Sequence, residues 1–248
     1  MDLSSICSST AGNWIPIGDV ASNPSLSFEG TFDGRGHKIN NLYINDNSLS
    51  NRALFGQIKN ANILNLTLSG TVTGAKDKIS GIVAYAENSN LENCNNYVSV
   101  NNTSASNYVT SGIAGYVKDT NVKNCKNYGN VSTLYQQAGG IVATTEQSDN
   151  TKIIDSCENY GNITSTNIAG GIVGYISKNG IIQNSNNFNC TIKTTTNYAA
   201  GGIAGYVGSV ANATIKDCKN SSYCESKAGG AGGMLGGSRR NCYNNWLC

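Results

Sequence analysis

The sequence predicts an all-β protein, a right-handed parallel β-helix (solenoid) of about seven coils, on three observations. A Cys-x-Asn unit recurs through most of the 248 residues. A second motif, of the type Gly-Ile-Val-Gly-Tyr, recurs with it at steps of 28 or 31 residues. The units are rich in Val, Ile, Thr, Tyr, Gly and Asn, which suits short strands joined by tight turns, and sustained helical apolar spacing is missing. Such repeats indicate stacked coils.

The Cys-x-Asn units predict a structural ladder of asparagines. In stacked coils a buried Asn can pass side-chain amide hydrogen bonds from one coil to the next, which satisfies groups that are costly to bury. Asn also tolerates the left-handed conformation that a sharp turn needs. The ladder residues are Asn96, Asn127, Asn159, Asn187 and Asn220. The residues two positions before them are Cys94, Cys125, Cys157, Ser185 and Cys218.

The Gly-Ile-Val-Gly-Tyr motif predicts one of three short strands in each coil. Its large aliphatic residue is expected to point into the core, as are aliphatics of the third strand such as Val131 and Ile163. The expected inward residues of the motif are Leu54, Ile82, Ile113, Ile141, Ile172, Ile203 and Met234.

Strand alternation then places a row of tyrosines on the outer surface, and these are the candidate ligand-binding residues. Such a row could stack on sugar rings or on a protein partner. The alternative is that a neighbouring turn covers the row, or that it only stiffens the sheet. The row consists of Tyr85, Tyr116, Tyr175 and Tyr206. A second aromatic column, from Tyr97 to Phe188, follows a turn and is expected to be packed.

The chain divides into three parts by these patterns. Residues 1–52 are expected to form an N-terminal capping segment and the first coil. Residues 53–237 hold the β-helix repeats, and residues 238–248 form a Cys-containing C-terminal tail.

The nine cysteines fall into separate groups. The cysteines of the Cys-x-Asn column are expected to be buried thiols, because Cβ atoms one coil apart are about 4.8 Å from each other, beyond the usual disulfide separation. Two pairs off that column could form disulfides, Cys190 with Cys224 and Cys242 with Cys248. Close Cys-x-x-Cys spacing is missing, so the sequence predicts no metal site.

Composition limits the partners. Only 13% of residues are charged and the net charge is +2, which predicts no nucleic-acid partner. Apolar runs long enough for a membrane span are missing, so no membrane insertion by this chain is expected. The first residues lack the basic region and apolar stretch of a signal peptide, so a secreted form would have lost its signal. No cofactor is expected.

Three N-terminal segments carry a resemblance to a known family. They are WIPIG at residues 14–18, FEGTFDGRGHKI at 28–39 and NLYI at 41–44. With the later repeats, across about residues 12–237, they resemble the GLUG-motif repeat family, whose Gly-Leu-any-Gly core residues 54–56 and 172–174 approximate. The resemblance implies β-helical segments of large bacterial surface proteins, including adhesins and immunoglobulin A1-cleaving metallopeptidases. It therefore implies a cell-surface or extracellular location, and it brings no active-site residue onto this chain.

The titratable residues predict no active site. His37 is the only histidine, and a zinc-peptidase motif needs two. Together with Asp33 it lies in a Gly-rich stretch that is expected to form a tight turn closing the first coil.

Glycoside hydrolysis is the other enzymatic possibility, and it normally needs two carboxylates facing each other across a groove. Glu92 and Asp155 share a column, but Lys123 lies between them. Glu158 follows Lys126 in another column, which suggests an outward ion pair instead.

The sequence therefore predicts a non-catalytic surface or secreted protein that binds a glycan or a host cell-surface protein. A structural spacer and a carbohydrate-active lyase or hydrolase remain as alternatives. A groove with converging acids would favour the enzyme, and a tyrosine face covered by turns would favour the spacer.

Overall fold

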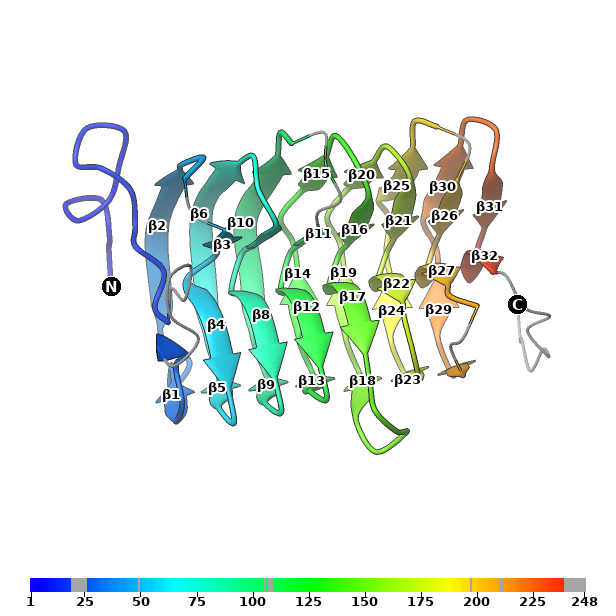
Figure 1. Ribbon diagram of the computed structural model, residues 1–248, viewed down its shortest axis with the longest axis horizontal. Coiled ribbons are helices and arrows are strands. Elements are labelled where there is room, and N and C mark those ends of the chain that lie inside the picture. Colours follow the sequence, from blue (N-terminus) through cyan, green and yellow to red (C-terminus); the bar gives the residue numbers. More distant parts are fainter. Residues whose placement is uncertain are drawn as a thin grey trace.

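The protein is a parallel β-solenoid in its computed structural model, which describes residues 1–18, 26–48, 50–104, 106, 109–196, 198–209 and 212–238. In these residues the regular elements are strands, which form four parallel sheets around one axis (Figure 1). The expected all-β solenoid is therefore confirmed. Among the same residues no helix is long and apolar enough to cross a membrane.

Each turn of chain passes through four sheets, numbered I to IV in the order in which the chain passes through them from β3 (Asn51–Arg52) onward. Sheet I contains β3 (Asn51–Arg52), β7 (Lys78–Ser80), β11 (Val109–Ser111), β16 (Gln137–Gly139), β21 (Ile168–Gly170), β26 (Ala199–Gly201) and β31 (Gly230–Gly232). Sheet II contains β4 (Phe55–Lys59), β8 (Val83–Glu87), β12 (Ala114–Lys118), β17 (Val142–Glu146), β22 (Val173–Ile176), β27 (Ala204–Val207) and β32 (Leu235–Ser238). Sheet III contains β1 (Thr31–Asp33), β5 (Asn62–Leu64), β9 (Asn90–Glu92), β13 (Asn121–Lys123), β18 (Ile153–Asp155), β23 (Gly180–Gln183) and β28 (Ala213–Lys216).

Sheet IV changes character along the solenoid. Its first three strands are long, and in later turns each is replaced by two short strands on either side of a bend. The long strands are β2 (Lys38–Asn45), β6 (Thr67–Gly74) and β10 (Asn95–Asn102). The short pairs are β14 (Lys126–Asn127) with β15 (Val131–Thr133), β19 (Glu158–Asn159) with β20 (Ile163–Ser165), β24 (Asn186–Asn187) with β25 (Thr191–Thr194), and β29 (Lys219–Asn220) with β30 (Tyr223–Ser226).

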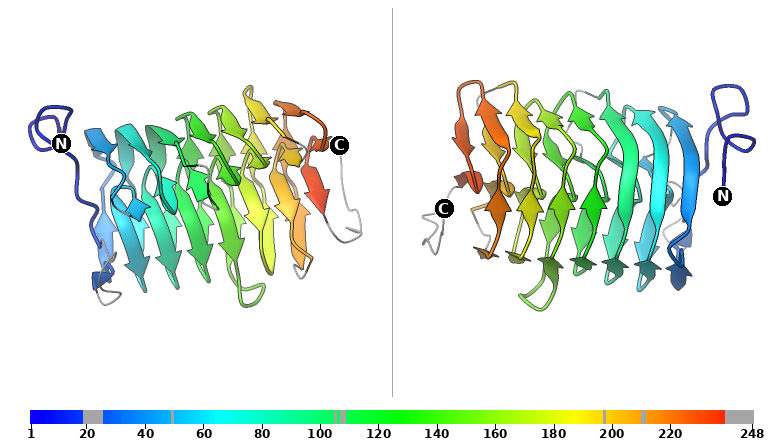
Figure 2. Two further views of the ribbon diagram at one scale, coloured as in Figure 1. Left: turned by 45° about the horizontal axis from the view of Figure 1, so that its top comes forward. Right: turned by 180° about the vertical axis from the view of Figure 1, so that it is seen from behind.

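The solenoid is right-handed. In Figure 1 the chain descends through sheet II on the near side and advances from β4 towards β32. The reverse view in Figure 2 shows sheet IV rising on the far side. In the described residues sheet II has seven strands, from β4 to β32, which six turns of chain connect.

The expectation of three strands in each turn is wrong, because a sharp corner precedes the Gly-Ile-Val-Gly-Tyr strand. At this corner the Oγ of Ser80 donates a hydrogen bond to the carbonyl oxygen of Val83. In a later turn a Cβ on Gly139 would lie 1.9 Å from the carbonyl oxygen of Val142. Only a very small residue fits there, so the chain folds back closely and the residues before the corner form sheet I.

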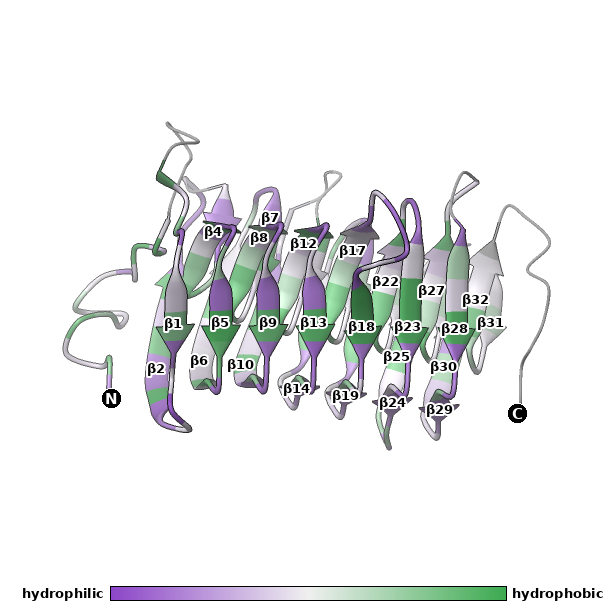
Figure 3. Ribbon diagram, turned by 90° about the horizontal axis from the view of Figure 1, so that it is seen from below, coloured by the Kyte–Doolittle hydropathy of each residue, from purple (hydrophilic) through white to green (hydrophobic). Residues whose placement is uncertain are grey.

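The core follows the expected inward columns. The expected aliphatics of the motif are fully buried except Met234, which packs against the core partly exposed in the last turn. Val131 and Ile163 of sheet IV are also buried. Figure 3 shows the consequence on sheet III, where a hydrophobic central residue lies between hydrophilic neighbours in β9 and β13.

The predicted asparagine ladder is present in the structure. Each Nδ2 donates to the Oδ1 of the next asparagine, at 2.9 Å from Asn96 to Asn127 and 2.8 Å from Asn127 to Asn159. The ladder continues at 2.8 Å from Asn159 to Asn187 and at 2.9 Å from Asn187 to Asn220. Asn220, in the last turn, is the only partly exposed member of these five.

The ladder asparagines do not occupy the left-handed turn position, which corrects one expectation. They lie in strands of sheet IV, and the left-handed residue lies immediately before each Cys or Ser of the column. These residues are Asn93, Asn124, Ser156, Asn184 and Asp217, with φ between 50° and 55°.

The column cysteines are free, buried thiols, as predicted. Each Sγ lies near the carbonyl oxygen two residues earlier, for example 3.2 Å from Cys125 to Lys123. The proposed pairing of Cys190 with Cys224 is wrong, because both are free and Cys224 is in register with Ile192 instead. Cys190 is in contact with Ser222, 3.2 Å from its hydroxyl. Cys242 and Cys248 lie outside the described residues.

The N-terminal segment packs against the first coil. The Trp14 Nε1 donates to the carbonyl oxygen of Leu54 at 3.1 Å. The rings of Phe28 and Phe32 each lie 5.3 Å from the ring of buried Phe55. The aromatic residues before the repeats thus shield apolar surface at the start of the solenoid.

Candidate functional site

The outward row of sheet II is interrupted once. Strand pairing places one residue of each turn in register, and a threonine replaces tyrosine in the middle of the row. Tyr85 stacks on Tyr116 with ring centroids 5.6 Å apart, and Tyr175 stacks on Tyr206 at 6.1 Å. The four tyrosines are half-buried, whereas Thr144 is only 3% exposed. The predicted row therefore exists as two stacked pairs on either side of Thr144.

A second row, from sheet I, faces the tyrosines across the corner. Lys78, Val109, Gln137 and Ile168 are in register with one another. The Lys78 Nζ lies 5.7 Å from the Tyr85 ring centroid, and Gln137 accepts a hydrogen bond from the Thr144 hydroxyl. Side chains of the two sheets thus meet on the solvent side of the corner and form the walls of a groove.

Small residues form the base of this groove and allow the backbones of sheets I and II to lie close together. A Cβ on Gly174 would lie 2.6 Å from the carbonyl oxygen of Ala138 in sheet I. On Gly205 it would lie 2.7 Å from Ala169 O. The fourth position of the Gly-Ile-Val-Gly-Tyr motif therefore takes only a small residue, Gly or, as at Ala84 and Ala143, Ala, because the backbones of sheets I and II lie very close there.

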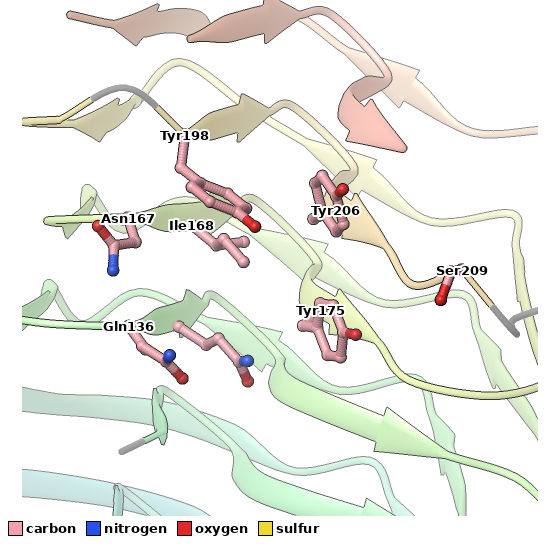
Figure 4. A pocket seen from close by; sticks show the side chains of 8 residues that line it. Gln136, Asn167, Ile168, Tyr175, Tyr198, Tyr206 and Ser209 are labelled. Carbon is pink, nitrogen blue, oxygen red and sulfur yellow. The ribbon is translucent and has the colours of Figure 1, made fainter. Parts of the chain in front are cut away.

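Two cavities open along the groove and share Tyr175, Gln136 and Gln137. The first is about 230 Å3 and is shown in Figure 4, where Tyr198 leans over Tyr206 beside Tyr175. The Tyr198 and Tyr206 ring centroids are 5.4 Å apart. The second, of about 450 Å3, lies between Tyr116 and Tyr175. Its other lining residues are Asp77, Lys78, Val109, Thr144 and Ser177.

Charged residues at the end of the sheet II strands hold Tyr116 in place. The Tyr116 hydroxyl donates to Glu146 Oε2, and the same carboxylate forms an ion pair with Lys178 at 2.5 Å. Burial first, and then the hydrogen bond to Glu146, raises the pKa of Tyr116 well above its ordinary value. Lys178 first, and then Tyr116, lowers the pKa of Glu146. The tyrosine is therefore a neutral donor fixed by a charged acceptor.

A similar pair stands one turn earlier. Lys118 and Glu87 form an ion pair at 2.9 Å, and that hydrogen bond raises the pKa of Lys118. Burial first, then the charge of Glu87, raises the pKa of Tyr85. The charged residues at the edge of the groove thus form ion pairs of opposite sign. The groove itself is lined by aromatic rings and by neutral hydrogen-bonding groups.

The second aromatic column is not packed, which corrects another expectation. Tyr97 and Tyr160 are 50% and 37% exposed. Rings from Tyr97 through Tyr128 and Tyr160 to Phe188 stack with centroids 4.5, 4.9 and 5.2 Å apart. Each of these residues follows a ladder asparagine that points inward, so alternation turns the ring outward. This column lies on sheet IV, and the groove lies between sheets I and II.

The acidic candidates lie outside the groove. Glu158 forms the expected outward ion pair with Lys126 at 2.8 Å. Asp155 accepts from Asn184 Nδ2 at 2.9 Å. Asp217 holds a left-handed turn position, and Glu92 is in register with Lys123. In the part of the chain that the structure describes, no group of three or more His, Cys, Asp or Glu side chains could hold a metal ion.

His37 lies in the expected tight turn. Its backbone N–H donates to the carbonyl oxygen of Gly34 at 2.7 Å, and the preceding Arg35 and Gly36 are left-handed. Asp33 accepts from the Arg35 backbone N–H and from Asn65 Nδ2. The Asp33 carboxylate thus stabilises the turn.

The sequence did not reveal the sheet I wall of the groove. The wall residues Lys78, Val109, Gln137 and Ile168 each stand seven residues before the row position of the same turn. That constant spacing was visible, but their chemical types differ, so no motif marks them. Tyr198 was also missed, since it occurs in a single turn.

The comparisons with known proteins support the fold. No family model matches the chain, and no curated protein matches it. Among solved structures the chain is similar to the crystal structure of a "putative immunoglobulin A1 protease" from Bacteroides ovatus, with a TM-score of 0.65 and 20% sequence identity. The match covers 96% of this chain and 75% of that one.

This likeness overturns one expectation. The sequence predicted a protein that is not an enzyme, yet a solved structure of the same fold over nearly the whole chain carries the name of a protease. The exclusion of catalysis is therefore withdrawn.

Proposed function

We propose that this protein is a glycan-binding β-solenoid that mediates adhesion at a cell surface or in the extracellular space. The observation that carries the proposal is the groove between sheets I and II, whose two cavities are lined by Tyr116, Tyr175 and Tyr206 together with amide and hydroxyl side chains. Aromatic faces match the apolar C–H faces of sugars, and the polar groups match their hydroxyls. Pockets of this mixed character are typical of small-molecule sites.

The repeated geometry suits a polymer. The row position recurs once per turn, about 4.8 Å apart, so neighbouring sugar units could be held at successive positions. Individually weak contacts then gain through effective concentration. The resemblance of the repeats to the GLUG-motif family is consistent with this role, since that family implies a bacterial surface context.

The proposal is tested by binding to a glycan array. The variant with Tyr116, Tyr175 and Tyr206 all changed to Ala is expected to lose binding while retaining the far-ultraviolet spectrum of a β protein. The matched control changes Tyr97, Tyr128 and Tyr160 to Ala, the same number of tyrosines on sheet IV. The control is expected to bind as the wild type does.

If the sheet IV variant lost binding and the sheet II variant kept it, the binding site would be the aromatic column of sheet IV. A wild type that binds no glycan, and no host-cell protein, would instead favour a structural spacer.

Cleavage of an immunoglobulin is a second candidate function, and the structural likeness favours it. It is tested by incubating the purified chain with immunoglobulin A1 and analysing the fragments by mass spectrometry. Specific fragments that appear with the wild type, and not with the chain heat-denatured beforehand, would establish catalysis by this chain. Intact immunoglobulin after prolonged incubation would leave glycan binding as the proposal to pursue.

A further inference from the structure

Thr144 creates a notch in the tyrosine row. It is in register with Tyr116 on one side and Tyr175 on the other. Thr144 is 3% exposed and its hydroxyl donates to Gln137 Oε1, so its short side chain is held low at the base of the groove. The cavity of about 450 Å3 lies above it. One ring is therefore missing from an otherwise regular stack.

The strand register leaves a gap of one ring position between Tyr116 and Tyr175. Two strand spacings separate the flanking tyrosines, or about 10 Å. A flat group inserted midway would lie about 5 Å from each ring, within the range of stacked aromatic contacts. It would continue the spacing of the existing pairs, which is 5.6 Å between Tyr85 and Tyr116.

One wall of the notch is fixed before any ligand arrives. The Tyr116 hydroxyl is held by Glu146, and Glu146 is held by Lys178. A wall that is already ordered loses little conformational entropy on binding. The notch is therefore suited to recognition of a single ring.

The rim indicates which ring fits. Most side chains around the cavity can hydrogen bond, whereas an aromatic side chain of a protein partner would bury them without partners, which is costly. A pyranose has two C–H faces for the tyrosines and hydroxyls around its edge for the rim. Asp77 and Lys78 supply one charge of each sign, which favours an uncharged sugar. The hydrogen-bonding residues are Asp77, Lys78, Gln136, Gln137, Thr144 and Ser177.

We propose that the notch over Thr144 is a subsite for one uncharged pyranose unit, inserted between Tyr116 and Tyr175. Gln137 is the expected hydrogen-bond donor to it, because its Oε1 already faces Thr144 and its amide NH2 remains to donate. This inference rests on the proposed glycan binding and names the position where one sugar unit is selected.

The test fills the notch with the residue that the repeat otherwise places there. Thr144→Tyr is expected to complete the row and fold normally, since tyrosine occupies the equivalent position in the neighbouring turns. Thr144→Val keeps the notch open and removes only the hydroxyl. Binding is measured by saturation-transfer NMR with glucose, galactose, mannose, N-acetylglucosamine and N-acetylgalactosamine as separate probes, and melting curves confirm folding.

The expected result is that the wild type binds at least one probe with a Kd in the millimolar range, as suits a ligand of this size. Thr144→Tyr should weaken that binding about tenfold or more, and Thr144→Val should change it about threefold or less. If Thr144→Tyr folded and bound the sugar as tightly as the wild type, the proposed subsite over Thr144 would be wrong.

The other outcomes separate the two proposals. Absence of monosaccharide binding would overturn the notch, while glycan-array binding that depends on the tyrosine row would still support the proposed function. N-acetyltyrosine amide, included as a probe, would overturn the sugar assignment if it bound in preference to all five sugars, and would point to a protein partner.

Discussion

The Oδ1 of Asn127 fills the space that a side chain on Gly112 would need, because a Cβ on that glycine would lie 2.2 Å from it. The same relationship links Gly81 to Asn96 and Gly140 to Asn159. The two motifs that recur along the sequence are therefore two sides of one contact across the interior. The first glycine of Gly-Ile-Val-Gly-Tyr is small because the asparagine ladder passes beside it.

The first prediction concerns this contact. Gly112→Ala is expected to destabilise the fold by about 2 kcal/mol or more, because an added methyl in a packed interior forces the backbone to shift. Gly140 O, 2.5 Å from the added Cβ, also prevents relaxation. The measurement is the free energy of unfolding in urea.

Gly233→Ala is the matched control for this prediction. It is the same motif position in the last turn, where the nearest atom to the added Cβ, Asn220 Nδ2, is 3.9 Å away. Its stability should stay within about 0.5 kcal/mol of the wild type. If both variants lost the same stability, close packing against the asparagine ladder would not be the reason for the glycine.

The second prediction concerns the ladder itself. Asn159→Ala removes the donor to Asn187 and the acceptor from Asn127, both at 2.8 Å, at a fully buried position. Leaving these groups unpaired should cost about 1–3 kcal/mol. Thermal melting compares it with Asn150→Ala, which removes an exposed asparagine from the loop between β17 and β18. Equal melting temperatures would contradict a structural ladder.

The repeats predicted the solenoid because in-register stacking makes one residue per turn repeat its environment. The direction of Ile172 and Tyr175 followed from strand alternation alone. The direction of Tyr97 did not, because the Cys-x-Asn unit was interpreted as the turn itself. The turn is one step earlier, at left-handed residues such as Asn93, so Asn96 and Tyr97 lie in a strand and alternate.

The groove could be predicted only in part. Its tyrosine wall repeats with a clear chemical signature, so the sequence revealed it. Its other wall depends on a corner so tight that Lys78 reaches Tyr85, and this closeness comes from backbone geometry. The notch needs both walls. The threonine at position 144 of the tyrosine row therefore did not predict a binding site by itself, because the sheet I wall depends on the tight corner.

The third prediction concerns the thiols. Burial raises the pKa of Cys125 well above its ordinary value and that of Cys218 to about 11, so little thiolate is present at pH 8. Alkylation by iodoacetamide, followed by mass spectrometry, should label Cys125 and Cys218 only after unfolding in guanidinium. An exposed thiol introduced by Asn150→Cys is the positive control and should react in the native state. Isolation of a Cys125–Cys157 disulfide from the folded protein would contradict this prediction.

The last prediction concerns Glu146 and pH. The ion pair with Lys178, and the hydrogen bond from Tyr116, lower the pKa of Glu146 in the folded state below the ordinary value of 4.5. A carboxylate with a depressed folded-state pKa stabilises the fold above its unfolded-state pKa, and this contribution is lost as pH falls through the folded-state pKa. Glu146→Gln removes that charge and keeps an oxygen that can accept from Tyr116.

The wild type should therefore be more stable than Glu146→Gln at pH 7, and the difference should shrink as the pH falls from about 5 towards 3. Urea unfolding at each pH measures it, with Glu29→Gln, an exposed carboxylate in the N-terminal region, as the control. The control should differ little from the wild type throughout. Because Glu146 also fixes the Tyr116 wall, any glycan that the wild type binds should bind more weakly to Glu146→Gln at pH 7. A stability difference that stayed constant across this pH range would show that Glu146 does not act through its charge.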